Sequence, residues 1–194
     1  MRTKRIGIGQ LIVGMCLSGL LLSTAKAAEP TWFGETADGR WLVGLRTYIV
    51  QNSADDFNNA KNNGLVLGYE FSRPMGYNGS STIEFEATTT YEDGDIGAGS
   101  VFGVPGKWDI DTFAIQFAYK TPGTVYFKGK LGAIHSDLHT TAPGINIETK
   151  EVSLAFGAGL GVNAGKNVEI EVEFNGSTGD NDFSLLSIGA NLLF

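Results

Sequence analysis

Apolar and polar residues alternate with a period of two along most of the chain. The clearest stretch is Val168-Glu-Ile-Glu-Val-Glu-Phe174, in which four apolar residues alternate with three glutamates. A period of two places successive side chains on opposite faces of a β-strand. The pattern predicts eight strands, over residues 40–51, 64–71, 82–92, 108–120, 125–138, 148–164, 168–176 and 183–194.

Turn residues separate these strands, and no proline falls within one. A proline inside a sheet would cost a ladder hydrogen bond. The connections fall into two alternating sets, as expected when consecutive strands pair antiparallel. One set, over residues 52–63, 93–107, 139–147 and 177–182, is mostly long and rich in Asn, Asp and Gly. The other set, over residues 72–81, 121–124 and 165–167, is mostly short. We therefore expect long loops at one end of the sheet and short turns at the other.

The first segment has the features of an export signal. Arg2, Lys4 and Arg5 precede an apolar run over residues 11–22, and small residues follow, ending Ala25-Lys26-Ala27. An A-x-A ending is typical of a cleavage site. A membrane anchor is the alternative, but the run is shorter than the ~20 residues that a helical span needs. We predict a cleaved secretory signal peptide over 1–27 and a single domain over 28–194.

Composition narrows the function classes. The chain has 194 residues, of which 18% are charged, and a net charge of −7. This acidity argues against a nucleic-acid partner, because phosphate binding needs a basic surface. The single cysteine, Cys16, lies in the predicted signal peptide, so neither a disulfide framework nor a cysteine-based zinc site is expected.

Alternation alone is compatible with two kinds of barrel. A soluble, lipocalin-like barrel buries its apolar face, whereas a membrane barrel turns that face outward. Export favours the membrane, and so does a polar face rich in Gly, Ala, Ser and Thr, which suits a narrow barrel interior. Aromatic residues near strand ends are typical of the girdles at the two membrane interfaces. They are Trp41, Tyr69, Phe71, Tyr91, Trp108, Tyr119, Phe127, Phe174 and Phe183.

Three segments resemble a known family. Ser187-Ile-Gly-Ala-Asn-Leu-Leu-Phe194 resembles the closing strand of bacterial outer-membrane β-barrels. Phe156-Gly-Ala-Gly-Leu-Gly-Val162 and Val168–Phe174 resemble strands six and seven of the small outer-membrane β-barrel superfamily, and residues 127–133 loosely resemble its fifth strand. That superfamily includes the transmembrane domain of outer-membrane protein A and small adhesin and resistance barrels.

The resemblance implies an all-β fold, an eight-stranded antiparallel up-and-down transmembrane β-barrel in the bacterial outer membrane. Both termini would lie in the periplasm, beside the short turns, with the longer loops outside the cell. Phe194 would be the signal read by the barrel-assembly machinery. The other implied partners are outer-membrane lipid and host or envelope surface ligands that meet the loops.

Strand parity places a set of charged and polar side chains inside such a barrel. They are Arg46, Glu70, Glu84, Glu86, Gln116, Lys128, Lys130, Glu169, Glu171 and Glu173. One interpretation is a gated ion path, and the other is a buried network that fills the lumen. Eight strands leave room for side chains rather than a wide pore, which favours the network. Because acids outnumber bases in this set, either some carboxylates are protonated or water enters.

Other candidate chemistry is weaker, and the sequence predicts no catalytic, cofactor or metal site. His135 and Ser136 are adjacent on a strand and point to opposite faces, so they cannot form a nucleophilic pair. His139 is expected in a loop, and a metal held by His135 and His139 lacks two further obvious ligands. The acidic stretches at 92–95 and 180–182 have no EF-hand spacing, and whether they bind Ca²⁺ stays open.

The expected function is therefore that of a non-catalytic outer-membrane barrel, serving envelope integrity or surface adhesion through its loops. A narrow pore for ions or small solutes is the alternative. A lipid-modifying enzyme is a third possibility, and it would need a cluster of His with Ser or an acid at the outer rim.

Overall fold

The computed structural model describes residues 39–54, 56–71, 79–100, 103–179 and 183–194, so the predicted signal peptide over 1–27 lies outside the described residues. The described chain is built of β-strands. They are β1 (Gly39–Asn52), β2 (Ala60–Phe71), β3 (Ser80–Glu92), β4 (Gly94–Ile96), β5 (Gly106–Lys120), β6 (Val125–Ala142), β7 (Ile145–Asn163), β8 (Val168–Thr178) and β9 (Phe183–Leu193). No helix in this part of the chain is long and apolar enough to span a bilayer.

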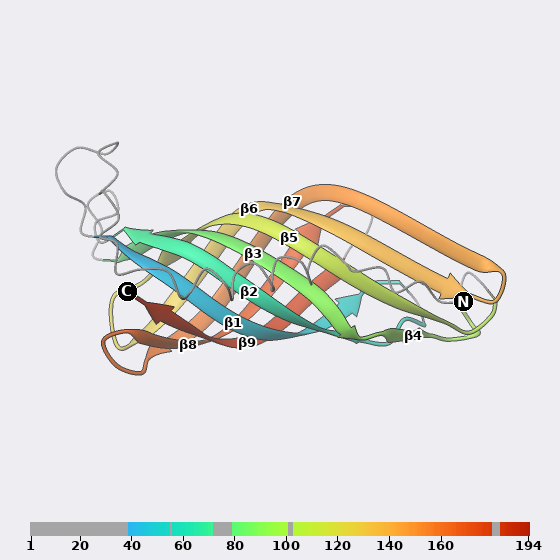
Figure 1. The fold of residues 1–194 in the computed structure, drawn as a ribbon, viewed down its shortest axis with the longest axis horizontal. Coiled ribbons are helices and arrows are strands. Elements are labelled where there is room, and N and C mark those ends of the chain that lie inside the picture. The colour runs from blue at the N-terminus through green and yellow to red at the C-terminus, as the bar shows by residue number, and fades with distance from the viewer. Residues whose placement is uncertain (1–38, 55, 72–78, 101–102, 180–182) are drawn as a thin grey trace, which may run out of the picture.

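Eight long strands form one closed antiparallel barrel (Figure 1). Each long strand pairs with the next, and β1 also pairs with β9, which closes the sheet. The short β4 lies inside the segment predicted as the loop 93–107, where it pairs with the start of β5 and its Ile96 also bridges to Phe57. Closure pairs each long strand on both sides around the barrel, whereas residues 145–153 of β7 pair only with β6 among the described strands. The predicted eight-stranded up-and-down barrel is confirmed.

The apolar face of each strand points outward. On β8, Ile170, Val172 and Phe174 are about half exposed, while the alternating Glu169, Glu171 and Glu173 are at most 3% exposed. On the other long strands the outward side chains are likewise mostly apolar, and the inward positions mix charged, polar and small residues with some apolar ones, such as Leu42 and Ile110. A soluble barrel would reverse this arrangement, so the membrane interpretation is confirmed.

The two ends of the barrel differ in a way that the sequence did not predict. At the end that holds Gly39 and Leu193, the terminal end, the turns span 121–124 and 164–167. At the opposite end, the hairpin end, β6 and β7 are joined only by Pro143 and Gly144 (Figure 1). The predicted loop 139–147 is therefore wrong, because most of it is strand. Gly144 has a φ of 77°, which suits the second central position of a type II turn after Pro143.

The predicted loop 52–63 is also too long, since β2 already begins at Ala60. Asn62 suggested a turn, but its side chain points into the barrel. There its Nδ2 donates to the Ile110 carbonyl at 2.7 Å and to Thr88 Oγ1 at 3.1 Å. These tertiary hydrogen bonds outweigh the turn preference of asparagine.

Towards the hairpin end, the interior holds an apolar cluster, and buried polar side chains such as Asn62, Thr88 and Thr112 lie beside it. We call this cluster the apolar plug, and its buried members are Tyr48, Val50, Ala60, Ile96, Trp108, Ile110, Ala114, Ile134, Ala155, Phe183 and Leu185. Trp108 has no exposed surface, and its Nε1 donates to the Asn58 carbonyl at 2.8 Å. Phe57 packs on the Trp108 ring, with ring centroids 6.0 Å apart.

Two of the residues predicted to lie in the aromatic girdles belong to the plug instead. Trp108 and Phe183 face the lumen rather than lipid, because each lies at an inward position of its strand. Trp41, Tyr91, Phe127 and Phe174 are exposed on the outer wall. Tyr69 packs against the rings of Trp41 and Phe71, with centroids 5.1 and 4.9 Å away.

Trp108→Ala tests the contribution of the plug to stability. Removing a fully buried indole leaves a cavity, and such truncations cost ~3–5 kcal/mol. We expect the urea midpoint of the refolded barrel to fall accordingly, as monitored by heat-modifiable migration on gels. Trp41→Ala on the outer wall is the control, with a smaller fall expected. Equal midpoints for Trp108→Ala and the wild type would show that the plug contributes little.

Candidate functional site: the charged lumen

The lumen between the plug and the terminal end is filled by charged side chains. All ten residues predicted to form the lumen network are at most 5% exposed. Three further inward residues join them: Lys120 on β5, Tyr126 on β6 and Asn191 on β9. We call this set the charge network. Its members come from β1, β2, β3, β5, β6, β8 and β9, which are all the long strands except β7.

Arg46 of β1 holds the centre of the network. Its Nη2 donates to Glu171 Oε2 at 2.6 Å, and its Nη1 donates to Glu173 and, at 3.3 Å, to Glu86 Oε2. Glu86 lies on β3, whereas Glu171 and Glu173 lie on β8. One guanidinium therefore joins three strands, with its fork of donors directed at carboxylates.

Two lysines of β6 complete this centre. Lys128 Nζ lies 2.6 Å from Glu84 Oε1 and 2.8 Å from Glu173 Oε1. Lys130 Nζ lies 3.2 Å from Glu84 Oε2 and 3.1 Å from Oε2 of both Glu86 and Glu173. Each ammonium group thus contacts at least two carboxylates, as a charge removed from water requires.

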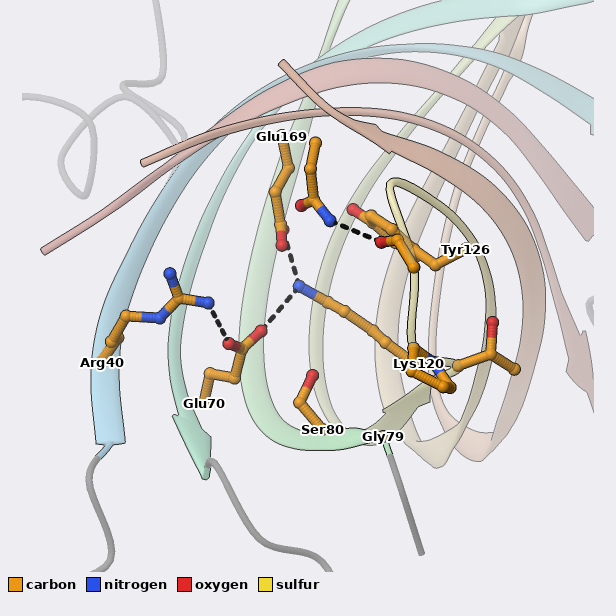
Figure 2. Close-up of a pocket in the computed structure, with 11 residues that line it drawn as sticks. Arg40, Glu70, Gly79, Ser80, Lys120, Tyr126 and Glu169 are labelled. Atoms are coloured by element: carbon orange, nitrogen blue, oxygen red, sulfur yellow. Dashed lines mark hydrogen bonds and ion pairs between the residues drawn. The ribbon is translucent and has the colours of Figure 1, made fainter. Parts of the chain in front are cut away.

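A second cluster lies at the terminal end (Figure 2). Lys120 Nζ lies 3.1 Å from Glu70 Oε2 and 2.6 Å from Glu169 Oε2. Arg40 binds the other oxygen of Glu70 at 2.5 Å, and Tyr126 donates its hydroxyl to Glu171 at 2.8 Å. An open cavity of about 260 Å³ at this mouth of the barrel is lined by Arg40, Glu70, Lys120, Tyr126 and Glu169 among others.

Lys120 and Arg40 change the charge balance that the sequence suggested. Each of the six inward glutamates has at least one cationic partner within 4.0 Å. When Lys120 and Arg40 are counted with Arg46, Lys128 and Lys130, the predicted surplus of acidic over basic side chains nearly disappears. Lys120 was missed because it ends its strand, although its parity with Gln116 places it on the inward face.

Glycines on the neighbouring strands provide the space for these long side chains. A Cβ added at Gly189 would lie 2.3 Å from Arg46 Cγ, and one at Gly161 would lie 2.2 Å from Tyr126 Cζ. The spaced glycines of β7 are therefore an interior-packing pattern, since larger residues would collide with the network. Gln116 stands opposite Glu84 in the strand register and is 2% exposed.

The remaining predicted residues lie apart from the network. Phe194 is 61% exposed on the outer wall, and its backbone N–H donates to the Trp41 carbonyl at 3.0 Å. His135 faces outward and Ser136 faces inward, so they do not pair. His139 lies on the outer face of β6 and not in the expected loop.

Comparisons with known proteins bear on this barrel. A family model described as the outer membrane protein beta-barrel domain matches residues 15–194. Among curated proteins, no sequence matches the chain. The attachment invasion locus protein Ail of Yersinia pestis has a similar structure, with a TM-score of 0.55 and 20% identity over 80% of this chain and 99% of that one.

Two further solved structures share the fold. The N-terminal β-barrel domain of Pseudomonas aeruginosa OprF has a TM-score of 0.56 and 13% identity, over 79% of this chain and 97% of that one. Neisserial surface protein A has a TM-score of 0.53 and 12% identity over the same shares. At these identities, the likeness extends to the fold alone.

Lys130→Ala tests the network. It leaves Glu84, Glu86 and Glu173 short of a cation in a buried site, which costs ~3–5 kcal/mol when no water replaces the lost partner. We expect a clear fall in the urea midpoint of the refolded barrel. The control is Lys61→Ala, which removes an exposed pair with Glu92 of 2.9 Å and should cost at most ~1 kcal/mol. Equal effects of the two variants would contradict a stabilising role for the network.

Proposed function

This chain belongs to the family of outer-membrane β-barrel proteins and is an integral protein of the bacterial outer membrane, and from that premise we propose that it is a non-catalytic barrel with a closed lumen. In this proposal it serves envelope integrity or surface attachment by presenting its hairpin end to ligands outside the cell.

The observation that supports the proposal is that two layers of side chains fill the lumen. The charge network occupies one half, and its ions pair with one another instead of lining a path for water. The apolar plug occupies the other half, where Trp108 and Ile110 have almost no exposed surface. An eight-stranded barrel is only wide enough for its own side chains, so two filled layers in series oppose conduction.

The shape of the strands supports a presenting role for the hairpin end. β6 has 18 residues and β7 has 19, whereas β8 and β9 have 11 each. A membrane-spanning β-strand needs ~9–11 residues, so about half of the β6–β7 hairpin extends beyond the bilayer. The outward side chains of this projecting part include Asp137, His139 and Lys150, which are polar.

The charge of this end bears on the kind of ligand. Ail, at 19% identity, was solved in complex with the heparin analogue sucrose octasulfate, a polyanion. In this chain, acids outnumber bases among the described residues near the hairpin end. The acids are Asp56, Glu92, Asp93, Asp95, Asp109, Asp111, Asp137, Glu148 and Glu151, and the bases are Lys61, Lys107 and Lys150. We therefore propose that its surface ligands are cationic or neutral rather than polyanionic.

Epitope tags test the orientation. A tag inserted between Pro143 and Gly144 should be detected by antibody on intact cells, because the hairpin is proposed to project from the cell. A tag between Pro122 and Gly123, in the turn at the terminal end, should be detected only after the outer membrane is permeabilised. The reverse pattern would overturn the orientation and the proposed role with it.

Planar-bilayer recording tests the closed lumen against the pore alternative. We expect the wild type to show almost no steady conductance, because the plug and the network lie in series. Trp108→Ala combined with Lys130→Ala should raise conductance if the barrel still folds, which gel migration checks. A steady cation-selective current in the wild type would reject the closed lumen and favour a pore, with the inward glutamates setting selectivity.

A further inference from the structure

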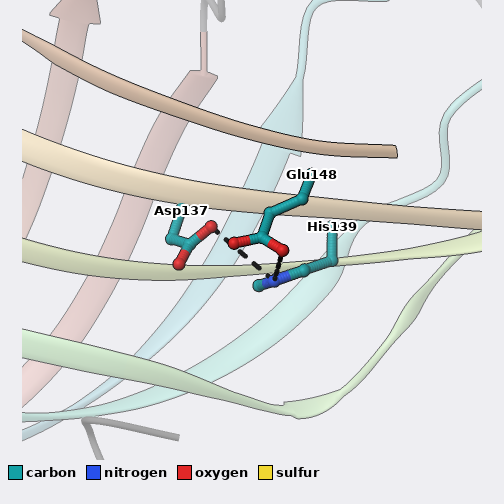
Figure 3. Close-up of side chains that lie close together, drawn as sticks. All are labelled: Asp137, His139 and Glu148. Carbon is teal, nitrogen blue, oxygen red and sulfur yellow. Dashed lines mark ion pairs between the residues drawn. The ribbon is translucent and has the colours of Figure 1, made fainter. Parts of the chain in front are cut away.

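A compact group of side chains lies on the outer wall of the β6–β7 hairpin, away from the lumen (Figure 3). His139 of β6 stands directly opposite Glu148 of β7 in the strand register, and Asp137 lies two residues earlier on the same face of β6. His139 also stands opposite Asp109 of β5 on its other side. Antiparallel pairing therefore brings one imidazole among three carboxylates.

We propose that Asp137, His139 and Glu148 form a binding site for one Zn²⁺ ion on the surface of the hairpin. The site is additional to the proposed closed lumen, and neither depends on the other. Its ligands would be His139 Nε2, Asp137 Oδ1 and Glu148 Oε2.

The distances fit a tetrahedral ion. Ligand atoms of the three residues all lie within 4.8 Å of one another. His139 Nε2 is 3.6 Å from Asp137 Oδ1 and 3.8 Å from Glu148 Oε2. Ligands held ~2.0–2.2 Å from zinc at tetrahedral angles stand ~3.3–3.6 Å apart, so only small side-chain movements are needed to close the site.

Lys150 orients the two carboxylates without occupying the place of the ion. Its Nζ lies 3.2 Å from Asp137 Oδ2 and 2.8 Å from Glu148 Oε1, which are the oxygens that the ion would not use. Asp137 Oδ1 is hidden from solvent and has no hydrogen-bond partner. A buried carboxylate oxygen without a partner is costly, and a cation at this point would remove that cost.

Asp109 lies behind the ring of His139, where a carboxylate would favour the tautomer that a metal needs. Asp109 Oδ1 lies 3.4 Å from His139 Nδ1, on the side of the ring away from the proposed ion. If Nδ1 carries the proton and directs it at Asp109, the Nε2 lone pair points towards Asp137 and Glu148. A carboxylate behind a ligating histidine is the usual outer partner in zinc sites, and it raises the basicity of the ligand.

The ligand set favours zinc over the hard cations. Ca²⁺ and Mg²⁺ prefer six or more oxygen ligands, whereas Zn²⁺ accepts one imidazole and two carboxylates with a fourth position left to water. The side chain of His139 is 31% exposed, so an ion can enter from solvent and a water can complete the site.

The test uses the full refolded barrel, stripped with a chelator and titrated with ZnCl₂ by calorimetry. We expect one equivalent to bind and to raise the unfolding temperature. His139→Ala and Glu148→Gln should weaken binding by more than tenfold, and Asp109→Asn by ~10–100-fold. His135→Ala is the matched control, because His135 lies four residues earlier on the same outward face of β6, and it should bind zinc like the wild type.

Each contrary result overturns the site. Absence of zinc binding to the folded wild type at micromolar concentration would reject it. Unchanged binding by His139→Ala, or equal losses in His135→Ala and His139→Ala, would place the ion elsewhere. If Ca²⁺ bound as tightly as Zn²⁺, and if His139→Ala left Ca²⁺ binding unchanged, the group would be a carboxylate patch in which the imidazole takes no part. The zinc titration does not depend on conductance or on tag detection, so its failure would not contradict the proposed function.

Discussion

The width of the lumen is the constraint on which the rest of this structure depends. Eight strands close into a barrel whose interior holds side chains and little else. Every inward group must therefore find its partner across that narrow space, and every outward group must suit lipid. Inward charges meet this demand only by pairing, which is why Arg46, Lys128 and Lys130 each contact more than one glutamate.

This constraint also explains why the interior divides into two layers. A charge network is tolerable where cations and carboxylates can be matched, and glycines on the neighbouring strands make room for their stems. Towards the hairpin end the inward residues include an apolar cluster, in which Trp108, Ile110 and their neighbours fill part of the same space. Hydrophobic burial then replaces ion pairing as the stabilising term, so the interior is filled by two different kinds of interaction in series.

In the proposed closed barrel, chemistry is available at the ends and on the part of the wall beyond the membrane. The β6–β7 hairpin is the element that extends this wall, because its strands continue well past the length that a bilayer needs. Its outward residues change from apolar, as at Leu131, to polar from His135 onward. The proposed zinc site lies in this polar region, where three neighbouring strands place Asp109, His139 and Glu148 side by side.

The sequence by itself determined the properties that depend on strand parity. Alternation of period two predicted eight strands within a few residues of their observed bounds and identified which side of each strand is apolar. The ten predicted lumen residues follow from the same parity, since a side chain's face is a local property of its strand.

The tertiary structure decided what depends on register and closure. Which glutamate meets Arg46 depends on the stagger between β1 and strands far along the chain, and no local pattern records that stagger. Trp108 resembled a girdle residue until its neighbours across the lumen were known. His139 is expected in a loop over 139–147, yet a two-residue turn at Pro143 and Gly144 keeps the strands paired and brings Glu148 opposite His139. Local alternation sets the direction of a side chain, whereas its partners are set by pairing between distant segments.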